Sequence, residues 1–128
     1  MEIRWITREI VLAVHARSLV DHGGADGVRD EDMLESAIAR PQNLAADEAP
    51  ELFDLAARYA FGLAKNHPFV DGNKRTAYLS TYVFLGLNGW ELDADEAEAA
   101  AITIDLAAGE VSEEEFALWL KVNCRETE

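Results

Sequence analysis

The sequence predicts an all-α protein, a helical bundle around one buried central helix with little or no strand. Apolar residues recur at three- and four-residue spacing along most of the chain, as in amphipathic helices. Capping residues precede these stretches, and several of them end at glycine. No repeat, low-complexity tract or long linker divides the 128 residues, so we expect a single domain over positions 1–128.

The first helix is predicted from the Thr7 cap to about Asp21, and Gly23-Gly24 follows as its stop. The side chains expected to face the core form an apolar stripe of Leu12, Ala13, Ala16, Leu19 and Val20.

A shorter helix is predicted from the Asp30 cap to about Arg40, before Pro41. Residues 41–50 then form the one substantial irregular segment. Taken alone, such a segment is a surface connection between helices.

The next helix follows Pro50 and spans Glu51 to Lys65. One of its faces carries Leu52, Leu55, Ala56, Tyr59 and Leu63. Residues 73–88 are apolar on several sides, through Ala77, Leu79, Val83, Phe84 and Leu87. We therefore predict that 73–88 is the buried central helix.

The C-terminal part begins with a short extended piece at residues 90–92. A helix over 94–108 follows, with Ala97, Ala101, Ile104 and Ala108 at helical spacing and Gly109 as its stop. Ser112 and Glu115 form a capping box for a last helix that carries Phe116, Trp119 and Leu120.

The chain is strongly acidic, with a formal net charge of −14. Nonspecific nucleic-acid binding needs a basic surface, so we expect no direct contact with DNA or RNA. Solvation of the outer faces explains most of the charge, and attraction of a basic partner segment is the alternative. A single cysteine, Cys124, predicts no disulfide framework, and no signal-peptide or membrane-spanning run is present. The expected location is the cytoplasm, away from any membrane.

The segment from His67 to Ala77 is the strongest functional signal. Gly72 can adopt backbone angles that let neighbouring amides turn toward a ligand. A helix that begins near Asn73 presents free N–H groups and the positive end of its dipole to an anion. Lys74 and Arg75 add two full charges at that position, which makes little sense without an anion.

His67 and Asp71 supply the reactive groups of the same segment. His67 has an ordinary pKa near about 6.5 and can accept a proton at cellular pH. Asp71 is a hard oxygen ligand suited to Mg²⁺, which needs few carboxylates when phosphate oxygens complete its shell. Asp71 could instead cap the following helix, and Asn73 could merely shape the turn. For His15 and His22 we expect structural roles.

With these residues the chain resembles the Fic/Doc family, and within it the Doc (death-on-curing) toxins. The Fic motif His-Pro-Phe-x-x-Gly-Asn-Gly-Arg is matched at His67, Pro68, Phe69, Gly72, Asn73 and Arg75. Lys74 replaces the second Gly, as in Doc toxins, and Tyr78 replaces the second Arg that Fic proteins carry three positions on.

The resemblance implies catalysis by His67, Asp71, Lys74 and Arg75, nucleotide binding at Gly72, Asn73, Lys74 and Arg75, and a metal site at Asp71. The cofactors implied are ATP, as substrate, and Mg²⁺. A Doc-type protein kinase would pass the γ-phosphoryl group of ATP to a threonine of elongation factor Tu and so block translation. The alternatives are a Fic-type adenylyltransferase, which moves AMP, and a noncatalytic binding module. Lys74 would crowd the phosphate floor that the second Gly makes, which favours the kinase.

The resemblance also implies partners. In Fic-like proteins a flap beside the active loop docks the backbone of the target, and residues 41–50 are its candidate here. Many Fic proteins carry an inhibitory helix with a Glu followed by Gly or Asn, and no Glu in this sequence has such a neighbour. We therefore expect inhibition in trans by an antitoxin protein, whose flexible segment folds as a helix on this domain.

Overall fold

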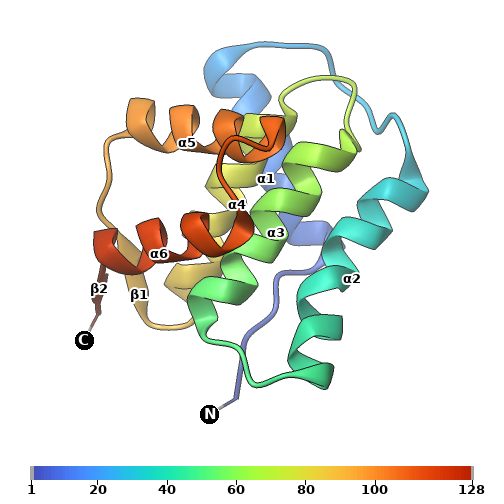
Figure 1. The fold of residues 1–128 in the computed structure, drawn as a ribbon. Helices are drawn as coiled ribbons and strands as arrows, with labels where there is room; N and C mark the ends of the chain where they lie inside the picture. The colour runs from blue at the N-terminus through green and yellow to red at the C-terminus, as the bar shows by residue number, and fades with distance from the viewer. Residues whose placement is uncertain (1, 128) are drawn as a thin grey trace.

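The computed structural model describes residues 2–127, which form six helices and one two-stranded antiparallel sheet. The helices are α1 (Arg8–His22), α2 (Glu31–Asp47), α3 (Leu52–Asn66), α4 (Asn73–Leu87), α5 (Glu96–Ala108) and α6 (Glu113–Asn123). The strands are β1 (Trp90–Leu92) and β2 (Cys124–Glu126). Figure 1 shows the helices gathered into one bundle with the small sheet at its edge. The predicted all-α class is confirmed.

The central helix is α3, so the expectation that residues 73–88 take this place was wrong. α3 packs against α2, α4, α5 and α6 and runs through the middle of the bundle (Figure 1). The small residues Ala56, Ala57, Ala60, Gly62 and Ala64 are buried along it and allow neighbouring helices to come close. On α4, in contrast, Leu79 and Val83 are only half-buried and Leu87 is exposed.

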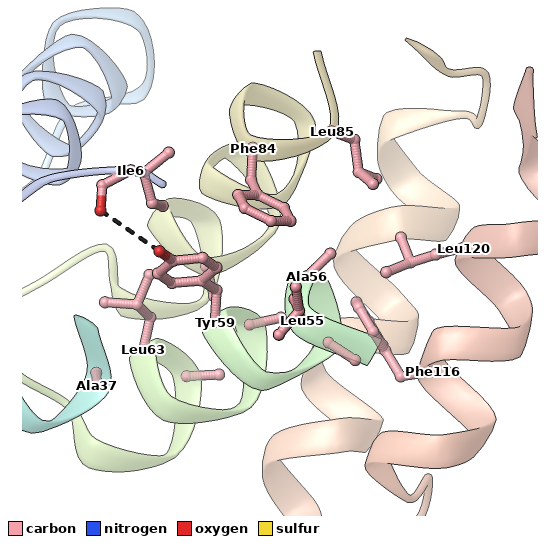
Figure 2. Close-up of a cluster of buried hydrophobic side chains, with 14 of the residues drawn as sticks. Ile6, Ala37, Leu55, Ala56, Tyr59, Leu63, Phe84, Leu85, Phe116 and Leu120 are labelled. Atoms are coloured by element: carbon pink, nitrogen blue, oxygen red, sulfur yellow. Dashed lines mark hydrogen bonds between the residues drawn. The ribbon is translucent and has the colours of Figure 1, made fainter. Parts of the chain in front are cut away.

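The core forms where α3 meets α4 and α6. The ring of Tyr59 lies 5.1 Å from that of Phe84, and its hydroxyl donates to the carbonyl of Ile6 at 3.4 Å. Figure 2 shows this contact, with Phe116 and Leu120 of α6 on the other side of α3. Full burial of side chains of this size contributes roughly 1.5–3 kcal/mol each, so α3 is the element that fixes its neighbours in place.

α2 begins at the predicted cap, where Asp30 accepts a hydrogen bond from the Met33 amide at 3.1 Å. It then continues through Pro41 to Asp47, so the predicted end near Arg40 was wrong. A proline inside a helix costs about 3 kcal/mol. Burial of Pro41 itself, and the packing of Leu44 and Ala45 against the core beyond it, offset that cost. Residues 41–47 are therefore helical, and the irregular connection before α3 is short.

α1 begins at Thr7 as predicted, but it buries a different face. Its buried residues are Val11, His15 and Ser18, while Ala13 and Ala16 are exposed and Val20 is 81% exposed. The predicted stripe was right only for Leu12 and Leu19, which are half-buried. It missed the buried face because two of the three buried side chains are polar and are buried against specific partners.

The apolar spacing that predicted a helix over 94–108 does not mark the face that α5 buries. Ala99, Thr103 and Leu106 are buried, and the spaced residues Ala97, Ala101, Ile104 and Ala108 are exposed. Alanine occurs all around this helix, so its apolar spacing could not distinguish the faces.

The C-terminal elements follow the predictions more closely. Ser112 and Glu115 form the capping box of α6, with hydrogen bonds of 3.0 Å in both directions. The extended piece at 90–92 is β1, which pairs with the unpredicted strand β2 in the register Glu91 to Arg125. Among the described residues 2–127, no helix is long and apolar enough to cross a bilayer.

Candidate active site

The loop between α3 and α4 carries the residues that the sequence singled out. His67 ends α3 in the left-handed region with φ 49°, and Gly72 begins α4 with φ 75°. Within residues 2–127, His67 is the one non-glycine residue with positive φ. This conformation costs an L-residue roughly 1–2 kcal/mol, so contacts around the loop must hold it.

A cavity of about 340 Å³ opens over the loop and is lined by His67, Val70, Asp71, Gly72, Asn73, Lys74 and Arg75. The structure therefore brings every predicted site residue to one place. The first backbone hydrogen bond of α4 runs from the Thr76 amide to Gly72, so the amides of residues 73–75 lie before the regular helical bonding. Free amides at a helix start are the expected features of an anion site.

Lys74 and Arg75 make no ion pair with a carboxylate in the part of the chain that the structure describes. Arg75 donates to the hydroxyl of Ser18 on α1, at a long 3.4 Å. A second cavity of about 330 Å³ near α6 differs in this respect, because its Arg58 pairs with Glu113 at 2.8 Å. Two cations without a carboxylate partner in a protein of net charge −14 suit a phosphate ligand.

The His67 imidazole is exposed to the cavity, and its pKa is lowered from the ordinary value of 6.5. Partial burial is the main cause, and the charges of Lys74, Arg29 and Lys65 act in the same direction. The neutral imidazole is therefore favoured near pH 7, which is the form that a general base requires.

Asp71 is tied into the loop on both carboxylate oxygens. Oδ1 accepts a hydrogen bond from the Gly72 amide at 2.8 Å, and Oδ2 accepts one from the Ala25 amide at 3.2 Å. These two bonds, Ala25 first, lower the pKa of Asp71 from 3.8. Asp71 thus does not cap α4 through its later amides. Gly24 has φ 122°, and a β-carbon there would come within 2.9 Å of Oδ2, so a side chain at this position would strain the backbone and displace the Asp71 carboxylate.

The carboxylate of Asp71 is charged and exposed, with lone pairs left for a hard cation. Among residues 2–127, no three His, Cys, Asp or Glu side chains converge as a metal cage. A single exposed carboxylate of this kind would suit Mg²⁺ in its usual nucleotide arrangement, where one carboxylate shares the ion with phosphate oxygens.

Asn73 stabilises the loop from inside. Its Oδ1 accepts from the Phe69 amide at 2.8 Å and its Nδ2 donates to the Phe69 carbonyl at 2.9 Å. The same Nδ2 lies 3.5 Å from Nδ1 of His67. The Asn73 side chain therefore shapes the loop and contacts the base, while its backbone amide remains at the start of α4.

Segment 23–30 lies beside the loop, in the position expected for residues 41–50. Val28 forms a β-bridge with Phe69, and the Val70 amide donates to the carbonyl of Gly27 at 3.0 Å. Residues 41–47 lie in the second half of α2, whose first turn contacts the end of α3 through a bond from Asn66 to Met33. Asp47 is about 21 Å further along the helix axis than Met33, so the expected flap position was wrong.

Two residues outside the predicted site, His15 and Arg29, complete the support. The His15 ring stacks on Phe69 with centroids 3.8 Å apart, and its Nε2 lies 2.8 Å from the Asp71 carbonyl. Arg29 donates from Nε to the His67 carbonyl at 2.7 Å and from Nη2 to the Asn66 carbonyl at 2.9 Å. The structural role expected for His15 is confirmed. No local pattern in the sequence marks Arg29.

Tyr78 stands where Fic proteins carry their second Arg. Its hydroxyl donates to Glu96 of α5 at 2.7 Å, and burial together with this carboxylate raises its pKa to about 12. Tyr78 is therefore neutral and already bonded, so it supplies no charge for a phosphate.

The loop therefore brings together a left-handed histidine, one exposed carboxylate and a helix start whose two cations pair with no carboxylate among residues 2–127. This combination makes it a candidate site for a phosphate ligand. Comparison of the sequence with known proteins leads to the same family that the loop motif resembles. The sequence profile of the Fic/DOC family matches residues 5–85. The chain is 37% identical over 111 residues to "Protein kinase doc" of Escherichia phage P1, covering 86% of this chain and 87% of that protein. It is 43% identical over 93 residues to "Toxin Doc" of Mycolicibacterium smegmatis, covering 71% and 69% respectively. This chain belongs to the Fic/Doc family.

Proposed function

We propose that this protein is the toxin of a toxin–antitoxin pair and acts as a protein kinase on a hydroxyl group of a cellular protein. The observation that carries the proposal is the cavity in which a base-competent His67 lies beside Lys74 and Arg75 at the start of α4. The relatives named as a kinase and as a toxin support the same assignment.

In the proposed reaction, His67 accepts the proton of the target hydroxyl as its oxygen attacks the γ-phosphorus of ATP. The bond between the γ-phosphorus and the bridging oxygen breaks, and ADP leaves. Lys74, Arg75 and the amides at the start of α4 neutralise the charge on the transferred group. Phosphoryl transfer depends mainly on positioning and electrostatics, so a small site of this kind is sufficient.

Asp71 is the residue that would hold Mg²⁺. When bound, the ion neutralises charge on the phosphate oxygens. The bonds from Ala25 and Gly72 keep the Asp71 carboxylate ionised and fixed in direction, which prepares it for such a ligand.

The resemblance to Fic proteins assigns target docking to a flap beside the active loop. We propose residues 23–30 for this role, because Val28 already bridges Phe69. An extended target segment would add its backbone to this edge, which places its hydroxyl near His67. By the same resemblance, the proposed target is a threonine of elongation factor Tu.

The alternative reaction is AMP transfer, as in Fic adenylyltransferases. It needs room for phosphates where Lys74 stands and the second Arg where Tyr78 stands, so we favour γ-phosphoryl transfer. A noncatalytic module is disfavoured by the complete set of His67, Asp71, Asn73 and Arg75.

The test is incubation of the purified protein with Mg²⁺, elongation factor Tu and ATP labelled at either the γ- or the α-phosphorus. Label in the target from γ-labelled ATP alone is the expected result, and mass spectrometry then locates the threonine. Label from the α-position alone would replace the kinase with an adenylyltransferase. Absence of transfer, both to elongation factor Tu and to a cytosolic extract added in its place, would favour the module. His67→Ala is the matched negative control.

A further inference from the structure

We propose that Arg29 is a positioning residue, which clamps the end of α3 and so holds the backbone of His67 in its left-handed conformation. The proposal rests on the proposed function, because it concerns the residue that acts there as the base. Arg29 does not itself line the cavity, and its side chain bonds only the backbone of Asn66 and His67. It makes no hydrogen bond to Gly72, Asn73, Lys74 or Arg75, the residues that we call the nucleotide cradle.

The first argument is the pattern of acceptors. Three successive carbonyls at the end of α3, those of Asn66, His67 and Pro68, all accept hydrogen bonds from residues 29 and 30. The Arg29 side chain takes the first two, and the backbone amides of Arg29 and Asp30 take the third at 2.7 and 3.1 Å. A helix end leaves such carbonyls without partners, and here one short segment satisfies them together.

The second argument is rigidity on the side of Arg29. Asp30 caps α2 through the Met33 amide, and Asn66 donates back to the Met33 carbonyl at 3.1 Å. Arg29 therefore projects from a fixed helix start. A planar guanidinium on such a base can reach two carbonyls in a defined direction, which a flexible ammonium cannot do.

The third argument is the unusual backbone at His67. A left-handed histidine would relax toward an ordinary conformation if its neighbours allowed it. Asn73 contacts only its ring, at 3.5 Å. Arg29 provides the side-chain contact to its main chain, so loss of the clamp would let the imidazole move while the loop from Phe69 to Gly72 keeps its own bonds.

The nucleotide cradle is held by other contacts. Asp71 is bound by Ala25 and His15, and Asn73 by Phe69. A positioning role for Arg29 therefore predicts a separation of effects, with a slower chemical step and unchanged nucleotide affinity.

The experiment compares the full chain with two variants. Arg29→Met keeps the aliphatic part of the side chain and removes the hydrogen-bond donors. Arg29→Lys keeps the charge but not the planar guanidinium that reaches two carbonyls. Arg29→Met should lower kcat about 10- to 100-fold, as expected for a misplaced reacting group. The KM for ATP should change less than about twofold, and Arg29→Lys should recover part of the rate. Arg125→Met is the control, because Arg125 pairs with Glu91 on the small sheet and should be silent.

A second readout is independent of activity. The ¹³Cα and ¹³Cβ chemical shifts of His67 report its backbone conformation, and they should move in Arg29→Met while those of Gly72 to Arg75 stay in place. Parent-like kcat and unchanged His67 shifts in Arg29→Met would overturn the proposal. So would an equal loss of nucleotide binding and of overall fold, because that describes a merely structural residue. If the parent chain transfers no phosphate at all, the proposed function fails, and the His67 shifts alone decide the role of Arg29.

Discussion

Nε2 of His15 donates a 2.8 Å hydrogen bond to the backbone carbonyl of Asp71, which joins the middle of α1 to a loop 56 residues later in the chain. The His15 ring also stacks on Phe69, the residue that Asn73 holds on both of its backbone groups. The loop of the candidate site is therefore supported by a buried histidine that belongs to neither the loop nor α4.

This relationship predicts the effect of His15→Leu, which keeps apolar volume and removes the hydrogen bond. The free energy of unfolding measured in urea should fall by about 1–2 kcal/mol. Hydrogen exchange of the Gly72 and Asn73 amides should become faster. His22→Leu is the matched control, since His22 is exposed at the end of α1 and its one carboxylate contact within residues 2–127 is with Glu96, at 3.6 Å. Its expected change is within about 0.5 kcal/mol. Equal losses in the two variants would contradict a supporting role for His15.

His15 and Ser18 also show why the sequence predicted α1 only in part. Its cap at Thr7 is a local signal, and local hydrogen bonding confirmed it. The buried face depends on partners far along the chain, namely the Asp71 carbonyl and the Arg75 guanidinium. The spacing of apolar residues cannot reveal this face, because its polar side chains are buried through hydrogen bonds to distant parts of the chain.

The candidate site, like α1, was predictable where its residues are close in sequence and not where they are far apart. A compact motif placed His67, Asp71, Lys74 and Arg75 within nine residues, and one loop brings them together. Arg29 lies 38 residues before His67, so its contact depends on the packing of α2 against α3. The predicted end of α2 before Pro41 was wrong for the opposite reason. The local tendency of proline to stop a helix was outweighed by burial of Pro41 in the folded protein.

For His67→Ala we expect transfer to the target to fall about 10²- to 10⁴-fold, the usual contribution of a general base. The fold and ATP affinity should remain, because His67 is exposed and the cradle amides lie on α4. Single-turnover kinetics with labelled ATP and calorimetric ATP binding measure the two effects. His22→Ala serves as the control, and near-parent turnover in His67→Ala would remove the base assignment.

The direction of the His67 pKa predicts the pH dependence of the rate. Burial, then Lys74 and Arg29, lower this pKa below 6.5. The imidazole is then neutral at pH 7, and kcat/KM should fall only as the pH drops through the lowered value. The same shift makes protonation oppose folding, so the stability contribution of His67 is complete above pH 6.5 and is lost on acidification through the folded-state pKa.

Lys74→Met tests the cause of this shift, because it removes the largest charge effect and leaves the burial. The acid limb of the pH profile should move to higher pH, whatever the height of the plateau. Lys121→Met is the control, since Lys121 pairs with Glu51 away from the site. An unmoved acid limb in Lys74→Met would show that another group titrates.

Lys74→Gly tests the residue that distinguishes the proposed kinase from a Fic enzyme. It restores Gly72-Asn73-Gly-Arg75 and should abolish γ-phosphoryl transfer, with weak AMP transfer at most. Tyr78 limits the gain, because its neutral hydroxyl is bonded to Glu96 and offers no charge in place of the second Arg. Labelling with α- and γ-labelled ATP gives the answer directly. Parent-like phosphorylation would show that Lys74 does not set the reaction.

The proposed toxin role predicts what happens in a living cell. Expression of this chain alone should stop bacterial growth, because an active kinase without restraint would modify its target continuously. Co-expression of the protein encoded beside it should restore growth. The predicted inhibitor is a flexible chain with basic residues that folds as a helix on this domain, since the net charge of −14 favours a basic partner.

His67→Ala separates toxicity from mere overproduction. It should express at the level of the parent chain and leave growth unaffected, while it still binds the inhibitor, because His67 is a single exposed side chain. Growth arrest by His67→Ala would assign the toxicity to binding instead of transfer. Harmless, high-level expression of the intact chain without a partner would contradict the toxin proposal, even if the purified protein phosphorylates a target. Each outcome thus separates the cellular role from the chemistry of the loop.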